Sequence, residues 1–356
     1  MKNKFLKRLS IVCIFTVVLL LCSCKYLLIG KILENTPVQN FEVLWNDFDR
    51  LYGLFLVKNI DWDDCYVRYR SQIYEGMCDE EFFTVITKML DELNDNHVAL
   101  YTNNENFTSY HSCIYGSLGN NNLFNAGLVL SSYLSEYKLF SPASMGVYRG
   151  FWGIIGNDIG YIYFSGFENG LMELKLVIKD FLRACKDCTG IIVDVRNNEG
   201  GRDQEGKYIA GCFASEKKLY MTSRFRNGPS HDDFDEGNEW YVEPEGEFQF
   251  TKPVVLLTDR WAISAAETFT MAMRQNSNVT QIGNATSGAI SDAMPRELLN
   301  GWLYTVSIGD YRDAQGKSYE GVGIYPHIVS INSKEDIDAG RDGTLERAME
   351  FIRMGR

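Results

Sequence analysis

The sequence predicts an α/β domain that follows a small helical domain. After residue 153, apolar strand segments alternate with amphipathic helical segments, which is typical of a core with parallel strand pairing. Between residues 38 and 95, apolar side chains recur instead at helical spacing. The expected core elements are strands at 159–164, 190–195 and 253–257 and helices at 171–182, 203–213 and 264–275.

Each element has its own local signal. The first helix carries its apolar face from Phe41 to Tyr52, and the second follows a capping residue at Asp79. The segments 190–195 and 253–257 are continuous apolar runs, as expected of strands that are buried on both faces. The stretch 214–250 is rich in acidic residues and reads as a long insertion or lid-like loop.

Composition excludes several classes of protein. The 356 residues are 45% hydrophobic and 23% charged, with 31 Gly and 7 Pro, so the chain is neither collagen-like nor disordered throughout. With 35 basic and 47 acidic residues the net charge is −12, which argues against a nucleic-acid partner. The four His and nine Cys form no zinc-type cluster, and we expect no metal or organic cofactor.

The N-terminus has the pattern of a secretory signal. Basic residues in 1–8 precede an apolar run at 9–21, which is too short for a comfortable membrane span of about 20 residues. The run ends near Cys24, in a sequence that resembles a bacterial lipoprotein box. We therefore expect residues 1–23 to be a lipoprotein signal peptide and Cys24 to be lipidated. The alternative is an uncleaved anchor helix, and both place the protein in the bacterial cell envelope, attached to a membrane.

After the signal peptide, the sequence pattern divides the chain into four parts. These are a tether at 24–37, the N-terminal helical domain at 38–100, a short linking region at 101–152 and the core domain at 153–356.

Cys185 and Cys188 have the spacing of a redox motif, but they follow a helical pattern and precede a strand. They read as a packing pair or a local disulfide.

Four separated segments carry residues suited to acyl-transfer chemistry. His97 follows Asn96 near the end of the helical domain, and Gly200-Gly201 follows the strand that ends at Asp194. Ser264 opens a helix after the strand 253–257, and Glu320 lies near the end of the core. A serine at a strand-to-helix junction exposes its hydroxyl near free helix amides, which favour an oxyanion.

The other residues supply what a serine lacks. A free hydroxyl is a weak nucleophile and needs a base, for which His97 is the candidate. Glu320 could orient the imidazole, and amides at Ala265 and at Gly200 or Gly201 could bind the oxyanion. Each piece has a structural alternative: Ser264 as a helix cap, His97 as a structural histidine, Gly200-Gly201 as a turn and Glu320 as a solvated turn residue.

Taken together, the segments resemble the C-terminal processing (tail-specific) serine peptidase family. The resemblance rests on Asp-x-Arg-x-Asn-x-Gly-Gly from Asp194, Ser-Ala-x-Glu from Ser264, Gly-x-x-Thr-x-Gly from Gly283, and Glu-Gly-x-Gly-Ile-x-Pro from Glu320. It implies a crotonase/Clp-protease-like core with a mixed sheet and flanking helices. It also implies Ser264 as the nucleophile and an extended peptide or unfolded protein segment as the substrate.

The chain lacks the lysine that one branch of this family uses as its catalytic base, which indicates the other branch. Members with a Ser-Lys dyad carry the lysine where this chain has Ala289, and no lysine lies between Ser264 and Lys317. The resemblance is therefore to the tricorn-core-like branch, which uses Ser, His and Glu, here Ser264, His97 and Glu320. A polar residue precedes the histidine in that branch, and here it is Asn96, whose amide can donate and accept hydrogen bonds.

Two departures separate the chain from many relatives. Residues 101–152 are too few and lack the pattern for a complete PDZ domain, so we expect that domain to be degenerate or absent. His327 replaces the usual acid after the last proline, and we interpret it as a surface substitution rather than as a second histidine of the active site.

The sequence thus predicts a lipid-anchored serine peptidase, with an inactive peptide- or ligand-binding protein on the same fold as the alternative. An esterase that uses the same triad is a third possibility.

Overall fold

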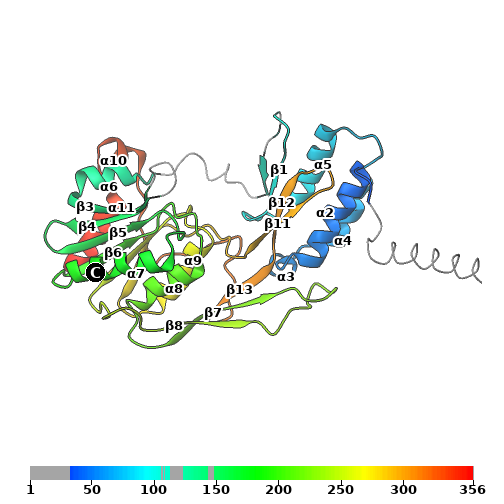
Figure 1. Cartoon of the computed structure of the whole chain (residues 1–356). Helices are drawn as coiled ribbons and strands as arrows, with labels where there is room; N and C mark the ends of the chain where they lie inside the picture. Colours follow the sequence, from blue (N-terminus) through cyan, green and yellow to red (C-terminus); the bar gives the residue numbers. More distant parts are fainter. Residues whose placement is uncertain (1–32, 106, 108, 113–122, 143–147, 356) are drawn as a thin grey trace, which may run out of the picture.

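The computed structural model describes residues 33–105, 107, 109–112, 123–142 and 148–355. Cys24 and the expected signal peptide lie outside the described residues. Within them, no helix is both long and apolar enough to cross a bilayer. The described chain forms an elongated molecule, with the core at one end and the N-terminal helices at the other (Figure 1).

The core is built on a seven-stranded mixed sheet in the order β14-β10-β9-β6-β5-β4-β3. Strands β5, β6, β9, β10 and β14 pair in parallel, and β3 and β4 add an antiparallel edge. The strands are β3 (Leu134–Pro142), β4 (Tyr148–Ile155), β5 (Ile159–Phe164), β6 (Gly190–Asp194), β9 (Val254–Thr258), β10 (Val279–Gly283) and β14 (Ile328–Val329). The predicted α/β class is confirmed.

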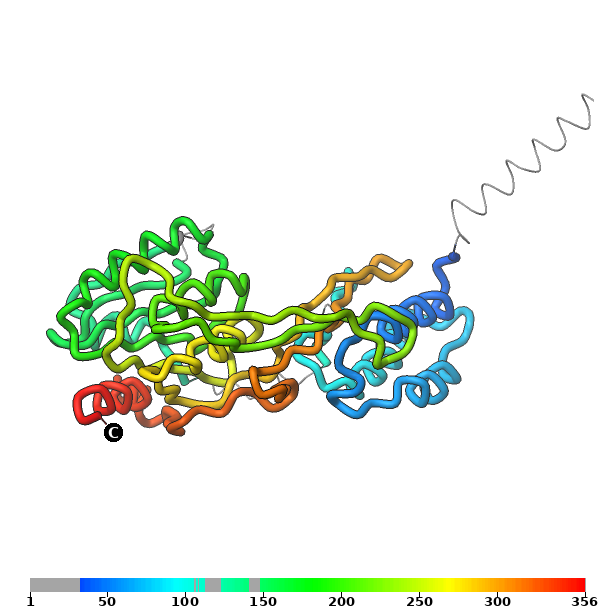
Figure 2. Tube along the Cα trace, turned by 90° about the horizontal axis from the view of Figure 1, so that it is seen from below, coloured from blue at the N-terminus to red at the C-terminus, as the bar shows by residue number. Residues whose placement is uncertain are grey.

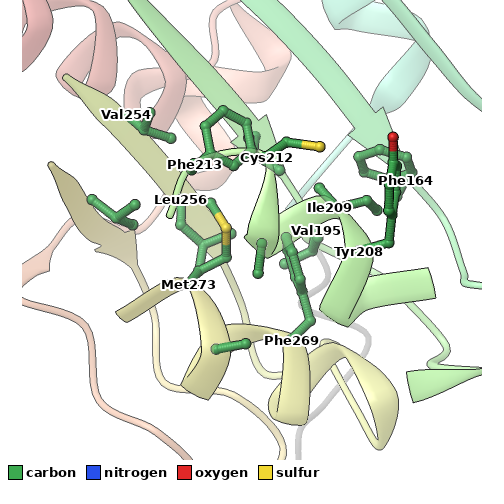
Figure 3. Close-up of a cluster of buried hydrophobic side chains, with 14 of the residues drawn as sticks. Phe164, Val195, Tyr208, Ile209, Cys212, Phe213, Val254, Leu256, Phe269 and Met273 are labelled. Atoms are coloured by element: carbon green, nitrogen blue, oxygen red, sulfur yellow. The ribbon is translucent and has the colours of Figure 1, made fainter. Parts of the chain in front are cut away.

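Helices cover both faces of this sheet (Figure 1). Side chains alternate along each strand, so Ile191 and Val193 pack against α7, α8 and α9, while Ile192 packs toward α6 and α11. Figure 3 shows part of the first interface, where Phe269 of α9 and Ile209 of α8 lie among the strand residues. The helices are α6 (Ala126–Ser132), α7 (Leu171–Ala184), α8 (Asp203–Gly211), α9 (Ala265–Arg274), α10 (Lys334–Asp338) and α11 (Gly343–Met354).

The sheet begins earlier in the chain than the sequence suggested. Strand β3 and most of β4 fall in the region 101–152, which we expected to link the domains, yet both are hydrogen-bonded members of the core sheet. Part of that region lies outside the described residues. In the rest of it we find one short helix and strands of two sheets, and no separate PDZ-like unit.

The N-terminal part is helical but also contains a sheet. Thr36 caps its first helix by accepting a hydrogen bond from the Gln39 amide, and Pro37 occupies the first turn. Strand β1 pairs with β2 on one side and, on the other, with β12 of the hairpin β11–β12, which comes from the core domain. The elements are α2 (Pro37–Leu51), α3 (Phe55–Lys58), α4 (Trp62–Arg70), α5 (Asp79–Asp91), β1 (Ala99–Tyr101), β2 (Ser109–His111), β11 (Ala293–Glu297) and β12 (Leu303–Ser307).

The prediction of a lid-like loop at 214–250 is wrong. Strands β7 (Lys218–Phe225) and β8 (Asn238–Val242) form a hairpin there, and β13 (Gly309–Asp313) pairs with β7. The hairpin reaches from the core to the N-terminal part (Figure 2), where His231 Nε2 lies 2.8 Å from Asp49 Oδ1. These strands were not predicted from the sequence, because the arm is only half-buried, carries charged residues and lacks a continuous apolar run.

The described cysteines are all free. Cys185 and Cys188 form no disulfide but lie together in the core, which supports the packing interpretation. Burial raises the pKa of the Cys185 thiol, so it stays protonated and unreactive.

A buried ion pair ties β6 to the C-terminal helix, and breaking it should destabilise the fold. Arg196 is 3% exposed, and its guanidinium donates to Asp194 Oδ2 at 2.6 Å and to Asp342 Oδ1 at 2.9 Å. Arg196→Met leaves two buried carboxylates without their cation, so we expect it to lower the free energy of unfolding by about 3–5 kcal/mol. Urea denaturation measures this change.

Arg183→Ala is the matched control for that experiment. Arg183 pairs with Glu247 on the surface, with a side chain that is 56% exposed, so its loss should cost less than about 1 kcal/mol. Equal losses for the two variants would contradict the structural role of Arg196.

Candidate active site

Ser264 lies at the junction that the sequence predicted, between β9 and α9. Its backbone has φ of 60° and ψ of −123°, an uncommon conformation for a residue with a side chain. Its N–H donates to Ala289 O at 2.9 Å, and its side chain makes no capping hydrogen bond to the helix. Ser264 thus occupies the N-cap position of α9, as the structural alternative expected, but its hydroxyl does not cap the helix and is left available at the start of α9.

Gly200 lies directly against Ser264. A Cβ on Gly200 would come within 2.7 Å of Ser264 Cβ and 3.1 Å of Ala265 N, so no larger residue fits without movement. The Gly200 N–H donates to Asn198 Oδ1 at 2.9 Å, and Gly200 O accepts from Phe167 N. This turn brings a glycine backbone to the serine, as the sequence motif predicted.

Two backbone amides remain available beside the hydroxyl. Among the described residues, no backbone carbonyl outside the helices and strands and no side chain accepts a hydrogen bond from Gly201 N–H or from Ala265 N–H. Gly201 is exposed, and Ala265 is the first residue of α9, where helix amides lack intrahelical partners. Since Gly200 N–H is already satisfied, Gly201 is the better of the two glycines for binding an anion.

Glu267 organises the loop that holds the serine backbone. Its buried carboxylate accepts from Thr286 Oγ1 at 2.6 Å, from Gly288 N at 2.8 Å and from Ala289 N at 2.8 Å. Burial raises the pKa of Glu267 to about 7, although these hydrogen bonds lower it. Sequence reasoning quoted this glutamate in the serine motif but gave it no role, because its partners lie about 20 residues away.

His97 sits on a short turn at the edge of the N-terminal part. Thr305 of β12 donates its hydroxyl to His97 O at 2.5 Å, and Asn96 Nδ2 donates to Ser287 Oγ at 2.8 Å. The Nδ1 atom of His97 is buried and has no partner among the described residues. Burial lowers the pKa of His97, against an opposing effect of Asp95, so the ring is neutral and able to accept a proton at neutral pH.

Glu320 is a buried carboxylate with one atom unpaired. Its Oε1 accepts from Ile290 N at 3.0 Å and from Ser291 N at 2.7 Å, while Oε2 has no partner in the described part of the chain. Burial raises the pKa of Glu320 to about 8, with a further rise from Asp95 and a lowering effect from Lys58. The interpretation of Glu320 as a solvated turn residue is therefore wrong.

The three predicted residues converge on one segment, residues 287–291. Ser264 attaches to it at Ala289, the His97 turn at Ser287 through Asn96, and Glu320 at Ile290 and Ser291. Five consecutive residues span at most about 18 Å, so the three groups share one region of the molecule. Within the residues described, their side chains do not hydrogen-bond one another.

His327 lies away from this segment, on the surface. Its side chain is exposed, and Nδ1 accepts from Gln281 N at 3.0 Å beside β10. This agrees with the interpretation of His327 as a surface substitution.

Comparison with known proteins identifies the same family of serine peptidases as the sequence motifs. Residues 158–330 match the model described as peptidase family S41, and residues 34–91 match the tricorn protease C1 domain. The chain carries a peptidase S41 domain. The resemblance proposed from the sequence is confirmed, and the S41 domain contains β5 to β14, with Ser264, Gly201 and Glu320. His97 lies outside both matched ranges.

Individual relatives have related names. The chain is 28% identical over 173 residues to the carboxy-terminal processing protease CtpA of Bacillus subtilis. The matched residues cover 48% of this chain and 35% of that protein. It is 28% identical over 198 residues to the tricorn protease of Thermoplasma volcanium, covering 54% of this chain and 17% of that protein. The chain thus spans less than half the length of these curated relatives.

A solved structure covers nearly the whole chain. A candidate peptidase from Parabacteroides merdae superposes with a TM-score of 0.79 and 29% sequence identity, over 90% of this chain and 97% of that one. The similarity includes the N-terminal part as well as the S41 domain, which supports the predicted order of a helical region followed by a core.

The raised pKa of Glu320 predicts a loss of stability between pH 7 and 8. The folded state binds this proton more tightly than the unfolded state, so the free energy of unfolding falls as pH rises toward the folded pKa of about 8. The expected fall over this interval is about 1 kcal/mol. Urea denaturation at both pH values measures it.

Glu320→Gln is the control variant, because it removes the titrating group and keeps the shape. Histidines titrate mainly below this interval, and a buried glutamate with a pKa of about 7, Glu267, contributes mostly below it as well. The variant should therefore lose about 1 kcal/mol less than the wild type over this interval, and an unchanged slope would contradict the assignment to Glu320.

Proposed function

We propose that this protein is a serine peptidase in which Ser264 is the nucleophile, His97 the general base and Glu320 the residue that orients the imidazole. The observation that carries the proposal is the attachment of all three to the segment 287–291, from three distant parts of the chain. The relatives named as proteases supply the reaction class.

The proposed reaction begins with attack of the Ser264 hydroxyl on a peptide carbonyl. His97 accepts the hydroxyl proton, and the negative charge that develops on the carbonyl oxygen is bound by the amides of Ala265 and Gly201. The tetrahedral intermediate collapses to an acyl-enzyme on Ser264, and His97 returns the proton to the leaving amine. Water then hydrolyses the acyl-enzyme by the same route.

The electrostatics of the site suit this sequence of proton transfers. Burial keeps His97 neutral before the reaction, so the ring is ready to act as a base. Glu320 keeps one buried oxygen without a partner in the described part of the chain, and in the proposed mechanism this oxygen accepts from the protonated imidazole. A positive charge on the imidazole would favour the ionised form of Glu320, so the pair stabilises the intermediate charge.

The proposed substrate is an extended peptide or an unfolded protein segment, as in the family that the sequence resembles. The turn at Gly200 and Gly201 carries no side chains beside Ser264, which favours the approach of a substrate backbone. We also propose that the protein is anchored by a lipid on Cys24 in the bacterial cell envelope, either in the periplasm or on the cell surface. Metabolic labelling with a tagged fatty acid tests the anchor, and Cys24→Ala should abolish the label.

Reaction with a fluorophosphonate probe tests the nucleophile. The probe labels serines activated by a base, so the wild-type protein should react and Ser264→Ala should lose the label completely. Ser131→Ala is the matched control, because Ser131 is an exposed serine on α6 and should not matter. Persistent labelling of Ser264→Ala would reject Ser264 as the nucleophile.

Turnover separates the proposed peptidase from its alternatives. A peptidase cleaves members of a peptide library and loses this activity in Ser264→Ala. Specific peptide binding without cleavage or labelling would instead indicate the inactive binding protein. Faster turnover of short esters than of any peptide would indicate an esterase.

A further inference from the structure

We propose that Asp95 and Tyr52 form a positioning pair for His97: Asp95 holds the turn that carries the histidine, and Tyr52 holds Asp95. The inference rests on the proposed function, because it concerns the residue that acts as the base there. Tyr52 lies outside the motifs from which the active site was predicted, and Asp95 precedes Asn96 and His97 in the sequence without a role assigned to it there.

Asp95 is buried, with 2% of its surface exposed, and both of its oxygens are used. Oδ1 accepts from His97 N at 2.9 Å, which closes a turn over Asn96 and fixes the direction of the histidine. Oδ2 accepts from Tyr52 Oη at 2.8 Å. Asp95 therefore connects the backbone of His97 to the end of α2.

Tyr52 is fixed on both sides. Its ring is fully buried and packs against Phe48 and Phe55, and burial raises the pKa of its hydroxyl, so the group stays a hydrogen-bond donor. Its carbonyl oxygen accepts from Arg226 Nη1 at 3.2 Å, at the far end of the β7–β8 arm. The position of His97 is thus connected, through Tyr52, to an element of the core domain.

The charge of Asp95 also faces the site. Three charged groups act on His97, namely Asp95, Asp292 and Lys58, and Asp95 has the largest of the three effects. The charges of Asp95, Lys58 and Glu267 also act on Glu320. Because Asp95 opposes the effect of burial on His97, it favours the protonated imidazole that forms during the reaction.

Three variants test the pair. Tyr52→Phe removes only the hydroxyl, Asp95→Asn removes the charge but keeps an oxygen for His97 N–H, and Asp95→Ala removes both contacts. Tyr304→Phe is the matched control, because Tyr304 is also buried and donates to an aspartate, Asp47, in the same part of the molecule. Circular dichroism and thermal unfolding establish that each variant is folded.

Peptide cleavage gives the first readout. We expect kcat to fall about tenfold in Tyr52→Phe and at least as much in Asp95→Asn, while Tyr304→Phe stays within twofold of the wild type. In Asp95→Asn the acid limb of the kcat/KM profile should also move to lower pH, because the charge that favours protonation of His97 is gone. Tyr52→Phe keeps that charge, so its acid limb should not move.

An NMR titration of the His97 ring gives a second readout that does not need activity. The ring should protonate at lower pH in Asp95→Asn than in the wild type, with His327 as an internal reference. Active wild-type protein with unchanged kcat in both Asp95→Asn and Tyr52→Phe, or an unchanged titration of His97, would overturn the pairing. A wild-type protein that neither reacts with the probe nor cleaves peptides, but shows the shifted titration, would reject the proposed function and support the pairing.

Discussion

The buried carboxylate of Glu267 is the constraint on which the rest of the site depends. It accepts from Thr286, Gly288 and Ala289 and so fixes the loop that leads into residues 287–291. A carboxylate can be buried at this cost only when hydrogen bonds surround it, and each of those bonds determines a backbone position. The serine backbone, the histidine turn and Glu320 then attach to a segment whose shape is already set.

The second requirement is the union of the N-terminal part with the core. His97 belongs to the first and Ser264 to the second, so neither part contains the proposed catalytic set alone. The hairpin β11–β12 pairs with β1, the β7–β8 arm reaches α2 and α3, and the Asn96–Ser287 hydrogen bond joins the two parts at the site itself. The similar structure from Parabacteroides merdae also covers both parts together.

Sequence reasoning located the elements with a strong burial pattern and missed those without one. The strand 159–164 and the helix from residue 171 lie where the periodicity indicated, because their buried faces are long and regular. The β7–β8 arm was mistaken for a loop, since half-buried strands with charged residues resemble loops in composition. The linking region was drawn too long because β3 pairs with a neighbour that local pattern cannot identify.

The sequence by itself determined the α/β class, the order of the motifs and the family, because helical and strand periodicity and motif spacing are local properties of a chain. Only the tertiary structure decided that Gly201 rather than Gly200 has a free amide, that Glu320 is buried, and that Asp95 connects His97 to Tyr52. The Asp95–Tyr52 contact joins residues 43 positions apart, and the Asn96–Ser287 contact at the same site joins residues 191 positions apart. Their geometry exists only once the chain has closed those distances and packed both parts together.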